Sequence, residues 1–241
     1  MAAPQNPALA PVDFNVNPPV PIIFVDTLLA AKPVRAKDGT VGAPRYGVNA
    51  LIAMDHPQMQ QMKDLIIRLA MAAFPDRRDP STGQWSSVGL TLPLKSSDKE
   101  YAKGHLVLNA GKPERGRPVG NEPGALLVPP RLWTINGGKY VQFDGPTRPA
   151  FAQLVWDGVL ASLAVQFKAY LGMGGGVTCY LNDVVTMNSG DKIEGVRADP
   201  AARFGHADSF AQYQGHVTAH DPAAGYTGVP ASPAPALTQN W

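Results

Sequence analysis

Two tyrosines and a lysine in the segment 159–188 could form a surface that binds single-stranded nucleic acid. Tyr170, Tyr180 and Lys168 all fall on the polar side of two stretches in which every second residue is apolar. Aromatic rings stack on bases and cations meet phosphates, which is how sequence-tolerant single-strand binders work. The same alternation also fits an ordinary half-exposed hairpin whose polar face has no ligand.

A glycine-rich turn joins the two stretches. Pairing residue 171 with residue 177 would set Lys168 opposite Tyr180 and Gln166 opposite Asn182, all on one face. The turn at 172–176 lacks the Gly-Lys-Ser/Thr ending of a phosphate loop and leads into a strand. We therefore expect a hairpin tip here and no nucleotide site.

Basic residues concentrate between positions 91 and 148. Nine lysines and arginines stand there against five acids, a net charge of +4, whereas the whole chain carries +2. Aromatic residues are interleaved with the bases, which suits a groove that follows a phosphate backbone. Together with the hairpin, the candidate contacts are Lys95, Lys103, Lys112, Arg115, Arg117, Trp133, Tyr140, Lys168, Tyr170 and Tyr180. A solvated loop surface with core aromatics is the alternative interpretation.

No group of residues favours catalysis or a metal centre. Cys179 is the only cysteine, which excludes a disulfide framework, and its apolar neighbours predict a core thiol. His216 and His220 have a spacing that could serve zinc, but they lack a cysteine partner, and their role stays open. Neither a Gly-x-Ser-x-Gly nor a His-Glu-x-x-His motif is present. We expect no enzyme activity, no cofactor and no metal.

Composition predicts one domain with non-globular ends. The 44% apolar content of the 241 residues suffices for a core, while charged residues make up only 17%. The N-terminus has no signal peptide and no apolar run approaches the length of a membrane helix, so we expect a cytoplasmic protein. Residues 1–19 and 205–241 lack periodicity, which predicts a disordered arm and tail around a domain at 20–204.

Most of the predicted elements are strands. They cover residues 20–29, 46–54, 90–94, 104–108 and 125–128, followed by a small hairpin at 131–143 with its turn at Asn136-Gly137-Gly138 and by the hairpin at 159–188. One amphipathic helix is expected at 57–74, with apolar residues spaced by three and four. Five or more antiparallel strands with a helix inserted early favour a mainly β fold, an open OB-like barrel. A small β-sandwich is the structural alternative.

The order of these elements resembles phage single-stranded-DNA-binding proteins with an OB fold, formerly a domain of unknown function and distantly similar to the T7-type protein. The match covers roughly residues 20–195 and is carried by the elements at 20–74, by Pro93-Leu94-Lys95 leading to Gly104–Ala110 and Lys112-Pro113, by Gly158–Tyr170, and by Gly176–Val185 followed by Ser189-Gly190-Asp191. The resemblance implies sequence-independent DNA binding in phage replication or recombination, in the cytoplasm of the infected host. It adds no catalytic residues.

The end of the chain departs from that family. Such proteins often end in an acidic tail with a terminal aromatic residue that recruits phage replication proteins. Here Trp241 is present, but residues 205–241 hold only Asp208 and Asp221 as acids. The sequence leaves the oligomeric state open between monomer and dimer. The rival interpretation is a structural phage protein, a tail or capsid β-domain that binds no nucleic acid.

Overall fold

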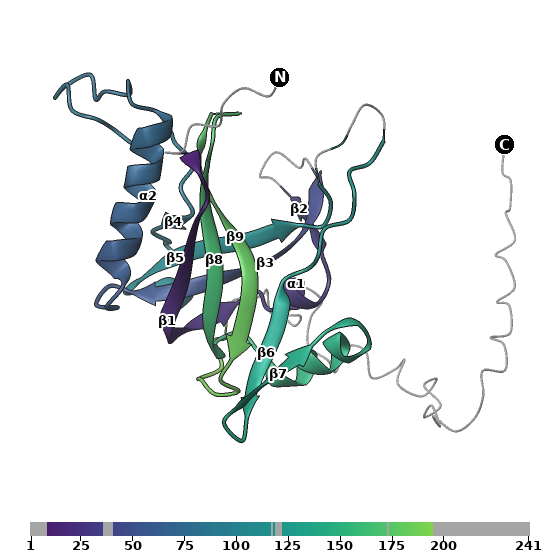
Figure 1. Ribbon diagram of the computed structural model, residues 1–241. Helices are drawn as coiled ribbons and strands as arrows, with labels where there is room; N and C mark the ends of the chain where they lie inside the picture. Colours follow the sequence, from purple (N-terminus) through teal and green to yellow (C-terminus); the bar gives the residue numbers. More distant parts are fainter. Residues whose placement is uncertain (1–8, 36–40, 117, 119–121, 173, 195–241) are drawn as a thin grey trace, which may run out of the picture. The chain divides into compact units, whose positions relative to one another are not determined.

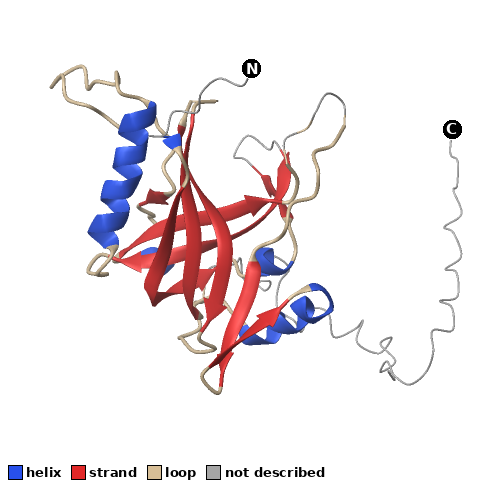
Figure 2. Cartoon of the chain, viewed as in Figure 1, coloured by secondary structure: helices blue, strands red, loops and turns tan. Residues whose placement is uncertain are grey.

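A single curled sheet forms the body of the protein. The computed structural model describes residues 9–35, 41–116, 118, 122–172 and 174–194. Within them, β1, β8 and β9 run side by side, and β3 and β5 cross behind them, with α2 beside the sheet (Figures 1 and 2). The strands are β1 Val12–Ile23, β2 Lys32–Arg35, β3 Val41–Ala53, β4 Leu94–Lys95, β5 His105–Pro113, β6 Arg131–Asn136, β7 Lys139–Phe143, β8 Leu160–Tyr170 and β9 Gly176–Thr186. The helices are α1 Asp26–Leu29 and α2 Met59–Ala73, with short 3-10 helices at Glu100–Ala102 and Gly145–Leu154.

The sheet is an open, OB-like barrel, as the sequence predicts. Its strand order is β4-β5-β3-β1-β8-β9-β6-β7, with β2 on the side of β3. The pairings are antiparallel except for that of β6 with β9, which is parallel. Strands β5 and β9 approach each other without forming a continuous ladder in the part of the chain described, which leaves the barrel open there. The inserted helix α2 follows β3 in the chain, packs against β8 and β9, and buries Met59, Met62, Ile66 and Leu69 in the core.

The N-terminal boundaries differ from the prediction. Residues 12–19 belong to β1 and not to a disordered arm, because Phe14 and Val16 alternate into the core while the strand pairs with β8. The end of the strand predicted at 20–29 is the helix α1, which buries Leu28. Residues 1–8 and the tail 205–241 lie outside the described residues, so disorder there stays a prediction.

The middle of the chain follows the prediction in part. The hairpin predicted at 131–143 is confirmed as β6 and β7, which turn at Gly137 and Gly138 with positive φ angles of 56° and 75°. The strands predicted at 46–54 and 104–108 lie within β3 and β5, allowing for one residue at an end. The strand predicted at 125–128 is wrong: Leu126 and Val128 are exposed, so this segment has no buried face to hold it in a sheet. Of 90–94, only Leu94 joins a strand.

Strand β8 separates an inner from an outer face. Its odd-numbered residues Leu163, Val165 and Phe167 are buried, while the even-numbered ones stay partly or fully exposed. The Phe167 ring meets the edge of Phe14 on β1, with ring centroids 5.9 Å apart. We call the side of the whole sheet that carries the even-numbered residues of β8 the outer face.

The predicted register of β8 against β9 is wrong by two residues. Tyr170 pairs with Gly176, so Lys168 lies opposite Thr178 and Gln166 opposite Tyr180. Gly176 packs directly on the backbone of Thr91, where an added Cβ would lie 2.1 Å from the Thr91 carbonyl oxygen, and Thr91 is hydrogen-bonded to its neighbours Gly175 and Val177. Because the shift is an even number, the side chains on both strands before residue 182 of β9 keep their predicted face.

A β-bulge interrupts β9 at Asn182. Val165 pairs with Leu181, but Ala164 pairs with Asp183, so Asn182 is an extra residue. Before the bulge, Cys179 and Leu181 point into the core; after it, Val184 and Thr186 do so. The bulge therefore turns Asp183 onto the outer face.

Replacing an inner residue of β8 should cost much more stability than replacing its outer neighbour. Phe167→Ala removes a fully buried ring and should lower the free energy of unfolding by about 3–5 kcal/mol. Lys168→Ala, on the exposed side, should change it by about 0.5 kcal/mol at most. Urea unfolding followed by circular dichroism measures both, and equal losses would contradict the face assignment.

Candidate nucleic-acid interface

Three depressions follow one another across the outer face. The tyrosine depression includes Tyr170, Tyr180 and Lys95; the central depression includes Lys112 and Asn182; the tryptophan depression includes Trp133 and Tyr140. The central and tryptophan depressions share Arg131 and Asp183 in their walls. Tyr180 and Asn182, two residues apart on β9, link the tyrosine depression to the central one. The result is a polar and aromatic path across the sheet.

The tyrosine depression lies where β9 approaches β3 and β5. Tyr170 and Tyr180 are half-buried, and Arg45 from β3 and Asn109 from β5 complete the wall. The Arg45 guanidinium lies across Gly111, where a Cβ would come within 2.7 Å of its Nη2 atom. Asn109 donates a hydrogen bond from Nδ2 to Asn49 Oδ1 at 2.8 Å. The curvature of the barrel thus adds a cation and amides to the predicted residues Tyr170, Tyr180 and Lys95.

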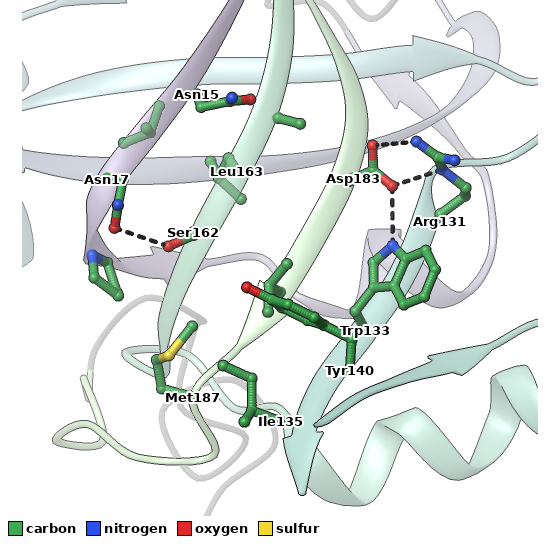
Figure 3. Close-up of a pocket in the computed structure, with 14 residues that line it drawn as sticks. Asn15, Asn17, Arg131, Trp133, Ile135, Tyr140, Ser162, Leu163, Asp183 and Met187 are labelled. Atoms are coloured by element: carbon green, nitrogen blue, oxygen red, sulfur yellow. Dashed lines mark hydrogen bonds and ion pairs between the residues drawn. The ribbon is translucent and has the colours of Figure 1, made fainter. Parts of the chain in front are cut away.

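The tryptophan depression is organised around the Asp183 carboxylate (Figure 3). The Trp133 indole donates from Nε1 to Asp183 Oδ1 at 2.9 Å. Arg131 meets the same carboxylate with Nε at 2.6 Å from Oδ1 and with Nη2 at 2.8 Å from Oδ2. This hydrogen bond and the negative charge raise the pKa of Arg131. The guanidinium carbon lies 6.0 Å from the Trp133 ring centroid, within cation–π distance.

Tyr140 reaches the same depression from the edge strand β7. Its side chain is 69% exposed and lies in Figure 3 beside Trp133. The predicted residues Trp133 and Tyr140 therefore come together, as do Lys95, Tyr170 and Tyr180 in the tyrosine depression. A ring that is exposed on one side can offer that side to a base.

Other predicted residues lie apart from these depressions. Lys168 is exposed on the outer side of β8 but lines none of the three. Lys103 precedes β5 at the end away from Lys112 and pairs with Glu100 at 3.7 Å. Arg115 donates to the carbonyl of Gly124 at 3.3 Å and lines none of them either. Arg117 lies outside the described residues.

The sequence alone does not identify Arg45, Arg131 and Asp183 as residues of the candidate interface. Arg131 belongs to the basic segment at 91–148 but does not stand out from its other cations. One signal for Asp183 is present, since an acid at position 183 breaks the apolar run at 177, 179 and 181 and so indicates a bulge. No local signal marks Arg45, which reaches Tyr180 only through the closure of the barrel.

Arg148, also counted in the basic segment, has a structural role. Its guanidinium donates to the carbonyls of Leu28, of Leu29 at 3.3 Å and of Pro130 at 2.8 Å. It also lies 5.3 Å from the Tyr46 ring centroid. Burial lowers the pKa of this side chain. Arg148 thus joins α1 to the start of β6.

The described residues offer neither a metal centre nor a membrane-spanning helix. They contain no cluster of three or more His, Cys, Asp or Glu side chains that could hold a metal ion. None of their helices has both the length and the apolar character needed to cross a membrane. His216 and His220 lie outside the described residues.

An open barrel with these strands and an inserted helix defines an OB-like fold, and comparison with solved structures gives particular relatives of that fold. The chain is similar to the single-stranded DNA-binding protein from bacteriophage Enc34 in complex with ssDNA, at 14% identity and a TM-score of 0.50, over 75% of this chain and 89% of that one. A second structure titled for that protein gives a TM-score of 0.51 at 14% identity, over 80% and 89%. The bacteriophage T7 single-stranded DNA-binding protein gp2.5 gives 0.44 at 14% identity, over 78% and 98%. The fold resemblance to phage single-stranded-DNA-binding proteins is thereby confirmed.

At this identity, the likeness concerns the fold. No protein-family model matches the chain, and no curated protein sequence does either.

The thiol beneath the tyrosine depression should be inert in the folded protein. Cys179 is 1% exposed, and burial raises the pKa of its thiol, although the charge of Arg45 acts in the opposite direction. The reactive thiolate should therefore be scarce at pH 8. Labelling with a thiol-reactive chromophore should be slow in buffer and complete in guanidinium chloride. Equally fast labelling in both would show that this part of the sheet opens readily.

Proposed function

We propose that the protein binds single-stranded DNA without sequence preference on its outer face. The observation that carries the proposal is the presence of aromatic side chains at both ends of that face, Tyr170 and Tyr180 at one and Trp133 and Tyr140 at the other. The similar fold of the Enc34 protein, whose structure is titled as a complex with ssDNA, supports it. The role is non-enzymatic, in DNA replication or recombination in the cytoplasm of a phage-infected bacterium.

The separation of the aromatic pairs suits a run of several nucleotides. Tyr180 and Val185 pair with Gln166 and Ser162, which are four residues apart on β8, or about 13 Å at the rise of a strand, and Trp133 pairs with Val185 on the neighbouring strand. OB folds cover about 4–16 nucleotides of single strand, so one molecule could engage bases at both ends of the face. Stacking on a base face requires no particular sequence.

The cations of the outer face suit contacts with phosphates. Arg45, Lys95 and Lys112 line the depressions, and Lys168 lies exposed on β8. No ion pair to these four side chains occurs among the described residues. Asp183 is paired with Arg131, and Asp13, which accepts a hydrogen bond from the neutral Gln166 amide at 2.9 Å, leaves one negative charge against these four cations. The face therefore carries a net positive charge.

The rival function, a structural phage protein, draws on exposed apolar side chains, one of which, Val128, also lines the central depression. Leu126 and Val128 are 66% and 73% exposed, and exposed apolar side chains of this kind often mark protein contacts. Failure to bind single-stranded DNA at low salt would favour this rival. Replication proteins as partners of the tail 205–241, and the oligomeric state, stay predictions.

Binding should depend moderately on salt. Four phosphate contacts predict that log K falls with log[salt] at a slope of about −3, and duplex DNA should bind more weakly because its bases are not free to stack. Fluorescence anisotropy of labelled oligo-dT at several salt concentrations measures the slope. Lys95→Ala should reduce it by about 0.7, while Lys103→Ala, away from the outer face, should leave it unchanged. A slope near zero would refute phosphate contacts.

Removing one tyrosine should weaken binding without unfolding the domain. Tyr170→Ala and Tyr180→Ala should each lower the affinity for oligo-dT about 5- to 150-fold, the range for loss of one stacked base. Gln166→Ala is the matched control, because Gln166 lies opposite Tyr180 on the same face and has no ring. Its affinity should stay within about threefold of the unmodified protein, since surface substitutions are usually mild. Unchanged affinity in both tyrosine variants would move the site to Trp133 and Tyr140.

A further inference from the structure

The Asp183 carboxylate restrains two side chains of the outer face at once. It accepts the Trp133 indole hydrogen at 2.9 Å and is bound by Arg131 at 2.6 and 2.8 Å. Only 14% of the Asp183 side chain is exposed, whereas 57% of the Arg131 side chain is. The carboxylate is thus more buried than the guanidinium that binds it, and Figure 3 shows Arg131 and Trp133 both reaching it. Its position is set by the bulge at Asn182 and by the pairing of Arg131 with Asp183.

This arrangement changes what Arg131 can offer to DNA. A bidentate pair with a carboxylate cancels the charge of the guanidinium, so a phosphate gains little from approaching it. The guanidinium plane stays available, however, and lies 6.0 Å from the Trp133 ring centroid. Planar guanidinium groups stack on aromatic systems, and a lysine ammonium lacks such a plane.

It also changes how Trp133 meets a base. An indole held by a hydrogen bond to a charged acceptor loses little conformational freedom on binding, because it is already ordered. A carboxylate on a face that meets a polyanion would repel it, but here Arg131 offsets that charge. The arrangement therefore favours stacking over phosphate contact at this end of the outer face.

We propose that Asp183 is a positioning residue that fixes Trp133 and Arg131 as one base-stacking platform, in which Arg131 acts through its plane and not as a phosphate ligand. This inference rests on the proposed binding of single-stranded DNA. It removes Arg131 from the set of phosphate contacts and assigns a binding role to an acid.

The first test replaces Arg131 by another cation. Arg131→Lys keeps the charge and loses the plane, so affinity for oligo-dT should fall about 2- to 5-fold, with an unchanged salt slope. Arg115→Lys is the matched control, because it makes the same change at an arginine that lines none of the three depressions, and it should leave affinity unchanged. If Arg131→Lys binds as tightly as the unmodified protein, Arg131 is a point charge and the platform is wrong.

The second test removes the charge of Asp183 and follows Trp133 directly. Asp183→Asn should move the Trp133 indole N–H resonance in ¹⁵N-labelled protein, which Trp133→Phe identifies, whereas Asp13→Asn should not move it. Near ~1 M salt, where charges are screened, Asp183→Asn should weaken binding about fivefold or more. At lower salt its slope should be steeper by about 0.7, because Arg131 becomes free for a phosphate. Tighter binding at every salt concentration would show that Asp183 only repels DNA.

Different results would contradict the proposed binding of single-stranded DNA and the proposed stacking platform. If the unmodified protein does not bind oligo-dT, the proposed function is wrong. If it binds and the Arg131 and Asp183 variants behave as their controls do, only the platform is wrong. Urea unfolding of each variant confirms that the comparison concerns folded protein.

Discussion

The double pairing of β8 is the constraint on which the outer face depends. This strand lies between β1 and β9, and its inner residues Leu163, Val165 and Phe167 are buried. A slip by one residue would move these side chains into water and bring Lys168 into the core. The polar surface is therefore fixed as firmly as the core, because both are opposite sides of one strand.

The bulge at Asn182 lets a single strand serve two kinds of surface. Before the bulge, Tyr180 of β9 lies on the outer face and lines the tyrosine depression. After it, the same strand presents Asp183 and Val185 outward and Val184 inward. The parallel partner β6 then places Arg131 beside Asp183 and Trp133 beside Val185, since paired residues share a face. One inserted residue thus joins the tyrosines to the tryptophan along one path.

Local periodicity was enough to predict β8, α2 and the turn at Gly137, and to assign Tyr170 and Tyr180 to the polar face. It missed the first half of β1, where Asn and Pro residues obscure the alternation of Phe14 and Val16. Features set by contacts between distant segments were beyond it. The register at Gly176 depends on Thr91, and the place of Arg45 depends on the closure of the barrel. A count of charges in a sequence window also does not say where in the fold each side chain lies. It therefore could not show that Lys95 lines a depression of the outer face while Lys103 lies away from it.

The distribution of charge bears on how strongly stacking must contribute. Of the basic residues between 91 and 148, Arg148 is used within the fold and Arg131 is neutralised by Asp183. The outer face keeps Lys95 and Lys112 from that segment and gains Arg45 and Lys168 from elsewhere. So few cations give modest electrostatic attraction, and a duplex offers little beyond its phosphates. The proposed binding of DNA therefore requires bases that are free to meet the rings of this surface, and that requirement would favour single strands over duplexes.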